Sequence, residues 1–367
     1  MREAPSGLMR GPRVLLVSPI PPPYGGIARW TRTMMDMDPD CVGAELILIN
    51  TAHRKQRSEE TPLASRVITG ATQFGRVLAQ FVKHLALGGR PACVHINSSG
   101  SLGLVRDLTV LALCRLLGLR SALHLRFGRT SKLLQEQRAG IEARLLLRAL
   151  KLASTTISID SGTYTAVTAE IGQERSVLIP NFINTADYVP RFERRSKTVL
   201  YLGSVTHLKG VDELLAAWNS LGIEGWTLRL VGPVSQVMKE AIGKCDGGQS
   251  IQVLGPSEHP EAMAYMCDAA FMVLPSHTEG FPNVVLEAMA TGTPIIASAV
   301  GAIPQMLADG AGIVVPPCNV GVLQEAILEF VTHAESRVGM ARRAHNRVMM
   351  EYSTQAVLAR YRRVWTP

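Results

Sequence analysis

Two glutamates that stand eight positions apart, Glu279 and Glu287, lie in the segment of the chain best suited to chemistry. This segment, Ser276–Gly292, directly follows an apolar run, so a strand, a loop and a helix are expected in that order. Pro282 disfavours helical backbone at the residue before it, and Asn283 is a favourable N-cap. The helix is therefore expected to begin at Asn283 or just after it, with Glu279 in the loop and Glu287 about one turn inside the helix.

Backbone N–H groups at the start of a helix attract a diphosphate. We therefore expect the free N–H groups at this helix start to face the diphosphate of a nucleotide sugar. The loop and first helical turn that contact this donor comprise Gly280, Phe281, Pro282, Asn283 and Val284. Glu287 is expected to accept hydrogen bonds from ribose hydroxyls, and Glu279 to contact a sugar. For either carboxylate alone, the alternative is an ordinary surface residue in a loop or on an exposed helix face.

A second loop of this kind is expected over Tyr201–Gly210, which reads Tyr-Leu-Gly-Ser-Val-Thr-His-Leu-Lys-Gly between an apolar strand and a helix. Gly203 and Ser204 stand at its start, where the backbone can approach a phosphate closely. Lys209 is placed to meet a phosphate. The alternative for Lys209 is a solvated lysine at a helix entry.

The first half of the chain has weaker candidates at two strand ends. Gly25 and Gly26 close the loop after the first predicted strand, where glycine leaves the amides unobstructed for a phosphate or sugar. A plain turn is the alternative. His124 lies near the end of another predicted strand, and because catalytic groups collect at strand ends, it is a candidate catalytic residue. A structural histidine is the alternative.

Three further residues near these strand ends are candidates for binding an acceptor. Arg126 and Arg129 follow His124 closely and are expected either to bind an acceptor phosphate or to cover the surface. Asn97 stands after a strand in the sequence Asn-Ser-Ser-Gly-Ser and is a candidate for an acceptor hydroxyl.

Twelve short apolar runs position these residues, and they alternate with segments of helical length. This alternation predicts two parallel, doubly wound sheets, which bind ligands beyond the carboxyl ends of their strands. Strands are expected near 14–18, 45–50, 93–97, 122–125, 155–159 and 177–179, and again near 198–202, 227–231, 251–254, 270–274, 294–297 and 312–315.

The domain prediction follows from this pattern. We expect a Rossmann-like acceptor-side domain over residues 1–183, a linker over 184–197, a Rossmann-like donor domain over 198–350, and a C-terminal helix over 351–367 that packs back on the first domain. The expected ligand site is the cleft between the two domains.

Charge is unevenly distributed along the 367 residues. Residues 1–183 carry 23 Lys+Arg against 13 Asp+Glu, a net +10, whereas the remainder has 15 against 17, a net −2. A basic half suits an anionic lipid surface or a phosphate-bearing acceptor, with a solvated basic surface as the alternative. Aromatic residues make up only 5% of the chain, and the pattern does not suggest nucleic-acid binding.

Six scattered cysteines without metal-ligand spacing favour a reducing compartment and no structural zinc. The start of the chain, Met1 to Pro12, lacks the apolar core of a secretory signal. A cytoplasmic location is expected, and peripheral attachment to the inner face of the plasma membrane is compatible with it.

The segment Glu279-Gly-Phe-Pro-Asn-Val-Val-Leu-Glu287 resembles the E-x7-E signature of a large retaining glycosyltransferase family, glycosyltransferase family 4, which includes bacterial transferases of polysaccharide and glycolipid assembly. Four further features are similar to those that usually accompany this signature in the family. They are the flanking sequence, the Lys209 loop, the Gly25-Gly26 pair and the strand-end histidine His124. Ser204 departs from the family, which usually has a basic residue there, so a second cation beside Lys209 is in doubt.

This resemblance implies a GT-B fold, two Rossmann-like domains facing across a cleft, and transfer of a sugar from a UDP- or GDP-type nucleotide-diphosphate sugar to a saccharide or lipid-linked acceptor. It also implies retention of configuration, catalysis by Glu279, His124 and Lys209, and no cofactor. No metal is required, whereas transferases of the other main fold hold a metal with an Asp-x-Asp motif. Two alternatives stay open: a non-catalytic scaffold that binds sugar nucleotides, and a two-carboxylate glycoside hydrolase.

Overall fold

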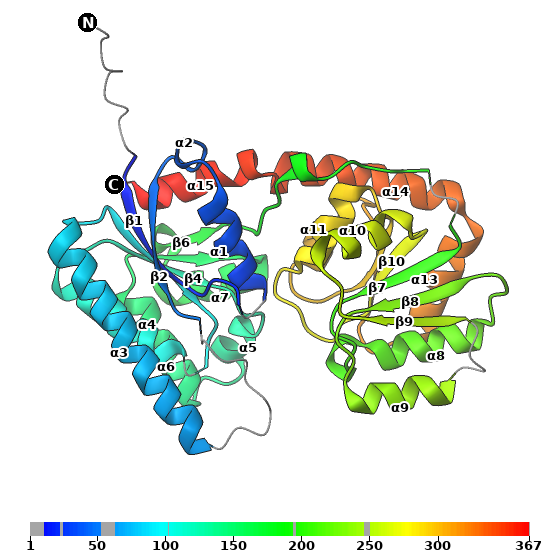
Figure 1. The fold of residues 1–367 in the computed structure, drawn as a ribbon, viewed down its shortest axis with the longest axis horizontal. Helices are drawn as coiled ribbons and strands as arrows, with labels where there is room; N and C mark the ends of the chain where they lie inside the picture. Colours follow the sequence, from blue (N-terminus) through cyan, green and yellow to red (C-terminus); the bar gives the residue numbers. More distant parts are fainter. Residues whose placement is uncertain are drawn as a thin grey trace, which may run out of the picture. The chain divides into compact units, whose positions relative to one another are not determined.

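The chain forms two compact units, which share its C-terminal helix. The computed structural model describes residues 11–22, 25–52, 63–101, 103–193, 196–245 and 250–366, with side chains described outside 63–71 and 244–245. Residues 1–179 and 358–367 make up the first unit, and residues 180–357 make up the second. The chain thus leaves the first unit near Ile179 and returns to it at Leu358, inside α15 (Thr354–Trp365) (Figure 1).

Each unit is built on one six-stranded parallel sheet, and all twelve predicted strands are present within one residue of their expected bounds. The first sheet has the order β2-β1-β3-β4-β5-β6. Its strands are β1 (Arg13–Ser18), β2 (Glu45–Asn50), β3 (Cys93–Ser98), β4 (Ser121–Leu125), β5 (Thr155–Ser158) and β6 (Ser176–Leu178).

The second sheet has the order β12-β11-β10-β7-β8-β9. Its strand order therefore reverses between β7 and β10, which lie side by side although β8 and β9 separate them in the chain. Its strands are β7 (Thr198–Leu202), β8 (Thr227–Val231), β9 (Ile251–Gly255), β10 (Phe271–Leu274), β11 (Ile295–Ser298) and β12 (Ile313–Val315).

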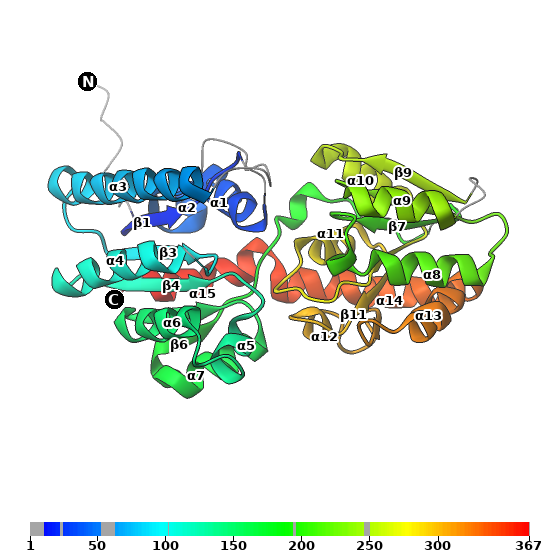
Figure 2. The same ribbon diagram turned by 90° about the horizontal axis from the view of Figure 1, so that it is seen from below.

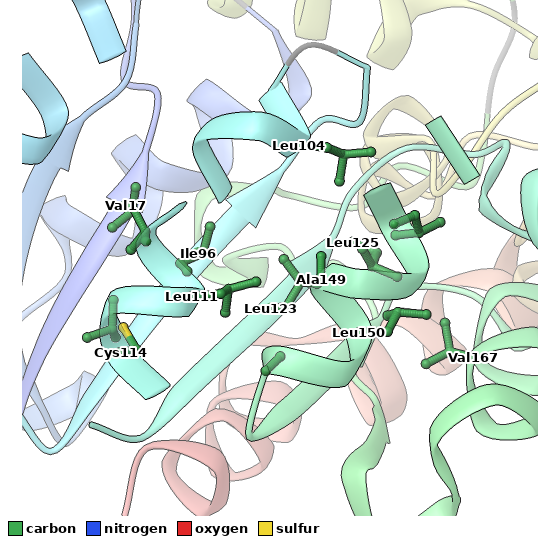
Figure 3. Close-up of a cluster of buried hydrophobic side chains, with 14 of the residues drawn as sticks. Val17, Ile96, Leu104, Leu111, Cys114, Leu123, Leu125, Ala149, Leu150 and Val167 are labelled. Atoms are coloured by element: carbon green, nitrogen blue, oxygen red, sulfur yellow. The ribbon is translucent and has the colours of Figure 1, made fainter. Parts of the chain in front are cut away.

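Helices cover both faces of the first sheet because its strand residues alternate between two buried environments. Leu123 and Leu125 of β4 face the apolar core under α4 and α6 (Figure 3). His124, between them, faces the opposite side, where α1 and α15 lie. The helices of this unit are α1 (Gly26–Asp36), α2 (Pro39–Val42), α3 (Leu63–Gly88), α4 (Gly103–Leu116), α5 (Thr130–Gln135), α6 (Ile141–Leu152), α7 (Ser161–Ile171) and η1 (Gln173–Arg175).

In the second unit α8 packs beside α13, and α11 packs beside α10 and α14 (Figures 1 and 2). Helix α11 ends at Gly292, whose φ of +68° is the left-handed cap expected of a glycine there. The helices are η2 (Thr185–Asp187), η3 (His207–Lys209), α8 (Val211–Leu221), α9 (Gln236–Cys245), α10 (His259–Asp268), α11 (Asn283–Thr291), α12 (Ile303–Met306), α13 (Val320–Thr332), α14 (Ala334–Arg347) and the π-helical η4 (Val348–Tyr352).

The unit boundaries differ from the predicted ones in two places. The second unit begins at residue 180, whereas the prediction ended the first domain at residue 183, placed a linker over 184–197 and began the donor domain at 198. The segment from 180 onward belongs to the second unit because Ile183 pairs with Ser353 as a β-bridge and Asn181 donates to the backbone of Phe281. At the other end, the last helix starts at Thr354, and the chain returns to the first unit only from Leu358. No helix among the residues that the structure describes is both long and apolar enough to cross a membrane.

Candidate active site

The best-formed group of predicted residues lies at the carboxyl ends of β7 and β10. These two strands flank the reversal of strand order in the second sheet, and ligands of open parallel sheets bind beyond the carboxyl ends of the strands at such a point. Lys209 comes from the loop after β7 and Glu279 from the loop after β10. The topology therefore brings together two residues that are 70 positions apart in the chain.

Lys209 and Glu279 form an ion pair. Lys209 Nζ donates to Glu279 Oε1 at 2.7 Å, and Ser276 Oγ donates to the same oxygen at 2.8 Å. The side chains are 33% and 14% exposed, respectively, so the pair is half-buried and still reachable from solvent. A carboxylate and an ammonium held in this way can meet a sugar hydroxyl and a phosphate, respectively.

Gly210 allows the two loops to cross closely enough for this pair to form. Its φ is +67°, and a Cβ at this position would lie 1.9 Å from the Pro275 carbonyl oxygen. Only glycine combines a left-handed backbone with such an approach. The glycine after Lys209 is thus required by the crossing of the loop after β7 and the loop after β10.

The first turn of the Lys209 loop is fixed by Tyr201 at the end of β7. Its hydroxyl donates to the Ser204 carbonyl oxygen at 2.7 Å, and burial, followed by the negative charge of Glu279, raises the pKa of Tyr201. Gly203 donates its N–H to Val231 O at 2.9 Å, while Ser204 is exposed. The loop thus presents Ser204 to solvent from a rigid base.

Helix α11 begins at Asn283, as expected, but Asn283 is not its N-cap. Pro282 occupies that position, and no side chain caps the helix. The Asn283 side chain instead accepts a hydrogen bond from Asn181 Nδ2 at 2.9 Å, and the same amide donates to Phe281 O. Asn181 therefore holds the start of α11 in place.

Glu287 lies within α11 and is 4% exposed. The alternative reading of an exposed helix residue is therefore wrong. Phe281 and Pro282 are buried, while Gly280 and Val284 are half-buried. Gly280 accepts a hydrogen bond from Ala302 N at 2.9 Å, which ties this loop to the segment after β11.

His124 is a core residue of the first unit. It is fully buried on β4, its Nδ1 lies 3.1 Å from His95 Nε2, and its ring packs against Trp30 and Tyr361. Burial lowers the pKa of His124 well below its ordinary value, and the pKa of His95 to about 3. This placement does not support a direct contact between His124 and a sugar, because neighbours from three elements enclose the ring.

The three acceptor candidates occupy different environments. Asn97 is buried and donates through Nδ2 to Ser18 Oγ at 2.8 Å, which ties β3 to β1. The Arg126 guanidinium lies 4.3 Å over the Trp30 ring, and burial lowers its pKa to about 10. Arg129 is the exposed one: it pairs with Glu142 at 2.7 Å.

Gly25 and Gly26 are exposed at the start of α1, and a Cβ at either position would meet nothing within 4 Å. Gly25 has an extended φ of 179° that any residue adopts. The described part of the first unit does not itself require glycine here. The proline run of this loop is described only as far as Pro22, so Pro23 and Tyr24 lie outside the described residues.

An Asp-x-Asp pattern does occur in the chain, at Asp36-Met-Asp38-Pro-Asp40. In the structure Asp38 is the N-cap of α2 and accepts from Asp40 N at 2.9 Å. Asp36 lies 3.8 Å from Arg32 in an exposed ion pair. These contacts explain Asp36 and Asp38 as end-of-helix residues.

Comparison with known proteins agrees with this geometry. The family model described as "Glycosyl transferases group 1" matches residues 185–347, a range that includes Lys209, Glu279 and Glu287. The matched segment, residues 185–347, is called the group 1 domain. A glycogen synthase of Mycobacterium tuberculosis is 30% identical over 195 residues, or 51% of this chain and 47% of that protein. The alignments span less than half the length of the first curated relatives.

The fold resembles solved structures over nearly the whole chain. Sucrose-phosphate synthase from Thermosynechococcus elongatus superposes with a TM-score of 0.76 over 97% of this chain and 98% of that one, at 19% identity. The Anabaena protein HepE, solved in complex with UDP-glucose, gives 0.70 over 95% and 98%, at 14% identity. The predicted GT-B fold class, with the group 1 domain as its second Rossmann-like unit, is confirmed.

Three contributors to the group 1 domain's site were not predicted as site residues. Ser276 and Tyr201 are the first residues of the two predicted loop segments, but a hydroxyl near a strand end is too common to identify a site residue. Gly210 was quoted beside Lys209, and only the observed crossing with Pro275 shows why glycine is needed there.

Proposed function

We propose that this chain transfers a hexosyl group from a nucleotide-diphosphate sugar to a saccharide or lipid-linked acceptor, with retention of configuration and without a metal ion. The observation that carries the proposal is the Lys209–Glu279 ion pair at the strand-order reversal of the group 1 domain. HepE, of similar fold, was solved with UDP-glucose, which supports a nucleotide-sugar donor.

The proposed reaction begins with exchange of partners at the ion pair. The donor diphosphate takes Lys209, and a hydroxyl of the donor sugar takes Glu279, which Ser276 keeps in place. As the bond between the sugar and the β-phosphate breaks, negative charge grows on the phosphate oxygen. Lys209 and the amides at the start of α11 are aimed at that charge and stabilise it.

Glu287 is proposed to accept hydrogen bonds from the ribose hydroxyls. Because only 4% of the residue is exposed, the contact is confined to a small part of its surface. Gly25 and Gly26 are proposed to face the donor as well, since their open surroundings leave room for a ligand's phosphate or sugar. His124 is proposed to act only through the packing of the first unit.

Donor binding is the first experiment. Thermal shift and calorimetry with UDP-, GDP- and ADP-sugars, with and without EDTA, compare the unchanged protein with Lys209→Met and with Glu287→Gln, which keeps the shape of a buried residue. Lys239→Met is the matched control, because Lys239 is exposed on α9. Chelator-insensitive binding of one donor, weakened by the first two variants and kept by the control, supports the proposal.

Turnover separates the alternatives. A scaffold would bind the donor and neither transfer nor hydrolyse it, and a glycoside hydrolase would cleave a glycoside without needing a nucleotide. The anomeric configuration of the product, read by NMR, tests retention. An inverted product would refute that part of the proposal.

The acceptor is proposed to be a saccharide or a phosphate-bearing lipid in polysaccharide or glycolipid synthesis, reached from the cytoplasmic side of the membrane. The net charge of +10 over residues 1–183 supports an anionic surface as partner. Co-sedimentation with vesicles at low salt tests this. Equal binding to anionic and to neutral vesicles would refute it.

A further inference from the structure

Three side chains with metal-ligand chemistry converge in the second unit. One ligand atom each from Glu213, His277 and Cys318 lies within 4.8 Å of the other two. Glu213 stands in the first turn of α8, His277 in the loop after β10, and Cys318 in the turn before α13. No spacing in the sequence indicates this group, because Glu213 and His277 alone are 64 positions apart.

From this convergence we infer a binding site for a divalent cation of the zinc class, which none of the comparisons assigns. Carboxylate oxygen, imidazole nitrogen and thiolate sulfur together are ligands that Zn²⁺ accepts and that Mg²⁺ and Ca²⁺ do not favour. Three protein ligands leave a fourth tetrahedral position for water. The site lies outside the proposed transfer reaction, which uses no metal.

The separation of the two half-buried ligands, His277 and Glu213, is close to what such an ion needs. His277 Nε2 and Glu213 Oε1 lie 2.9 Å apart, and two ligands at about 2.0 Å from a tetrahedral zinc ion are about 3.3 Å apart. The other carboxylate oxygen, Glu213 Oε2, is buried without a hydrogen-bond partner. A cation would replace the proton between His277 Nε2 and Glu213 Oε1 and would lie beside the unpaired oxygen Oε2.

The outer ligand and its surroundings fit the same role. Cys318 is exposed and free, and its φ of +56° is unusual for a residue other than glycine. The His207 ring packs edge to face against His277, with centroids 5.1 Å apart, and its Nδ1 lies 2.7 Å from Asp212 Oδ2. His277 is thus braced from the side. On binding, the Cys318 thiol proton passes to solvent.

The site would fasten the loop that carries the candidate active site. The backbone N–H of His277 donates to Leu208 O at 3.1 Å. Leu208 directly precedes Lys209, and His277 lies two residues before Glu279. An ion held by His277 would therefore join α8 and the turn before α13 to the two loops that hold the Lys209–Glu279 pair. In this inference the ion fastens the loops and takes no part in the sugar transfer.

Cobalt substitution tests the site on the full chain. The protein is stripped with a chelator, exchanged into metal-free buffer and titrated with Co²⁺, whose thiolate complexes absorb in the near ultraviolet. We expect one equivalent to give a thiolate-to-cobalt band that Zn²⁺ abolishes and that Cys318→Ser removes. Cys41→Ser is the control, because Cys41 is also exposed and free, and it should keep the band.

Two further readouts keep the test decisive. His277→Gln should weaken cobalt binding at least about tenfold, and Zn²⁺ should raise the melting temperature of the unchanged protein but not of Cys318→Ser. Absence of the band, or its persistence in Cys318→Ser, would overturn the inference. Loss of donor binding in EDTA that also occurs in Cys318→Ser, which lacks the proposed site, would count against metal-free transfer instead, so the two proposals fail separately.

Discussion

Replacement of Gly210 by alanine is expected to damage both the stability and the donor site of the second unit. Gly210 has a φ of +67°, and its built Cβ lies 1.9 Å from Pro275 O. A left-handed alanine costs about 1 to 2 kcal/mol, and forced overpacking adds about 1 to 3 kcal/mol. The expected loss in the free energy of unfolding is therefore about 2 to 5 kcal/mol.

Gly222→Ala is the matched control for the backbone part of this loss. Gly222 is also left-handed, with a φ of +53°, but its built Cβ meets nothing within 4 Å. It should cost only the conformational share, about 1 to 2 kcal/mol. For a unit of this size each kcal/mol lowers the melting temperature by about 2 to 4 °C, so the two variants are distinguishable in a thermal melt.

The same pair of variants separates the loop crossing from general stability. In Gly210→Ala the loop after β7 must move away from Pro275, which pulls Lys209 from Glu279, so donor affinity should fall even well below the melting temperature. Gly222→Ala should leave donor affinity unchanged. Equal losses of stability, or unchanged donor affinity in Gly210→Ala, would refute the role given to the crossing.

Three other predictions concern single contacts. Lys209→Met should lower kcat/KM about 10- to 150-fold, the effect of a lost charged hydrogen bond of about 1.5 to 3 kcal/mol, and Lys239→Met should not; steady-state kinetics decides. Because the pKa of His95 falls from 6.5 when unfolded to about 3 when folded, its stabilising effect is complete above pH 6.5 and is lost as the pH falls towards 3. Between pH 7 and pH 5 the free energy of unfolding falls by about 2 kcal/mol for this reason. Urea unfolding followed by tryptophan fluorescence should show that His95→Gln reduces this pH dependence, whereas the exposed control His333→Gln leaves it unchanged. Tyr201→Phe should cost about 1 kcal/mol of stability and weaken donor binding through the Ser204 turn, and an unchanged melt would show that its bond to Ser204 O is not stabilising.

The strands and the group 1 motif were predictable because both depend on the local amino-acid sequence. Apolar runs bounded by turn residues mark each strand, and Glu279 and Glu287 are joined by a continuous segment. The neighbours of His124 were not predictable, since Trp30, His95 and Tyr361 reach it from three distant elements. A strand-end histidine reads the same in sequence whether it faces a ligand or the core.

Pairings across the sheet were also beyond the sequence. Lys209 and Glu279 could each be assigned to a ligand, but the ion pair between them depends on β7 and β10 being neighbours. The N-cap prediction for Asn283 was wrong for a similar reason, because the Asn283 side chain accepts a hydrogen bond from a distant residue, Asn181. Local propensity describes what a residue can do, and tertiary partners decide which of these roles it fills.

The return of the chain to the first unit sets an order in which the protein can be built during synthesis. Trp365 Nε1 donates to buried His95 Nδ1 at 3.0 Å, and Tyr361 is fully buried beside it. A ribosome delivers these side chains only after residues 180–357 have emerged, so the second unit is complete in sequence before the first. Until then the first unit covers His95 and His124 on this side of its sheet with Trp30 of α1 but without Tyr361 and Trp365 of α15. The core of the first unit can therefore be completed only after the second unit has been translated.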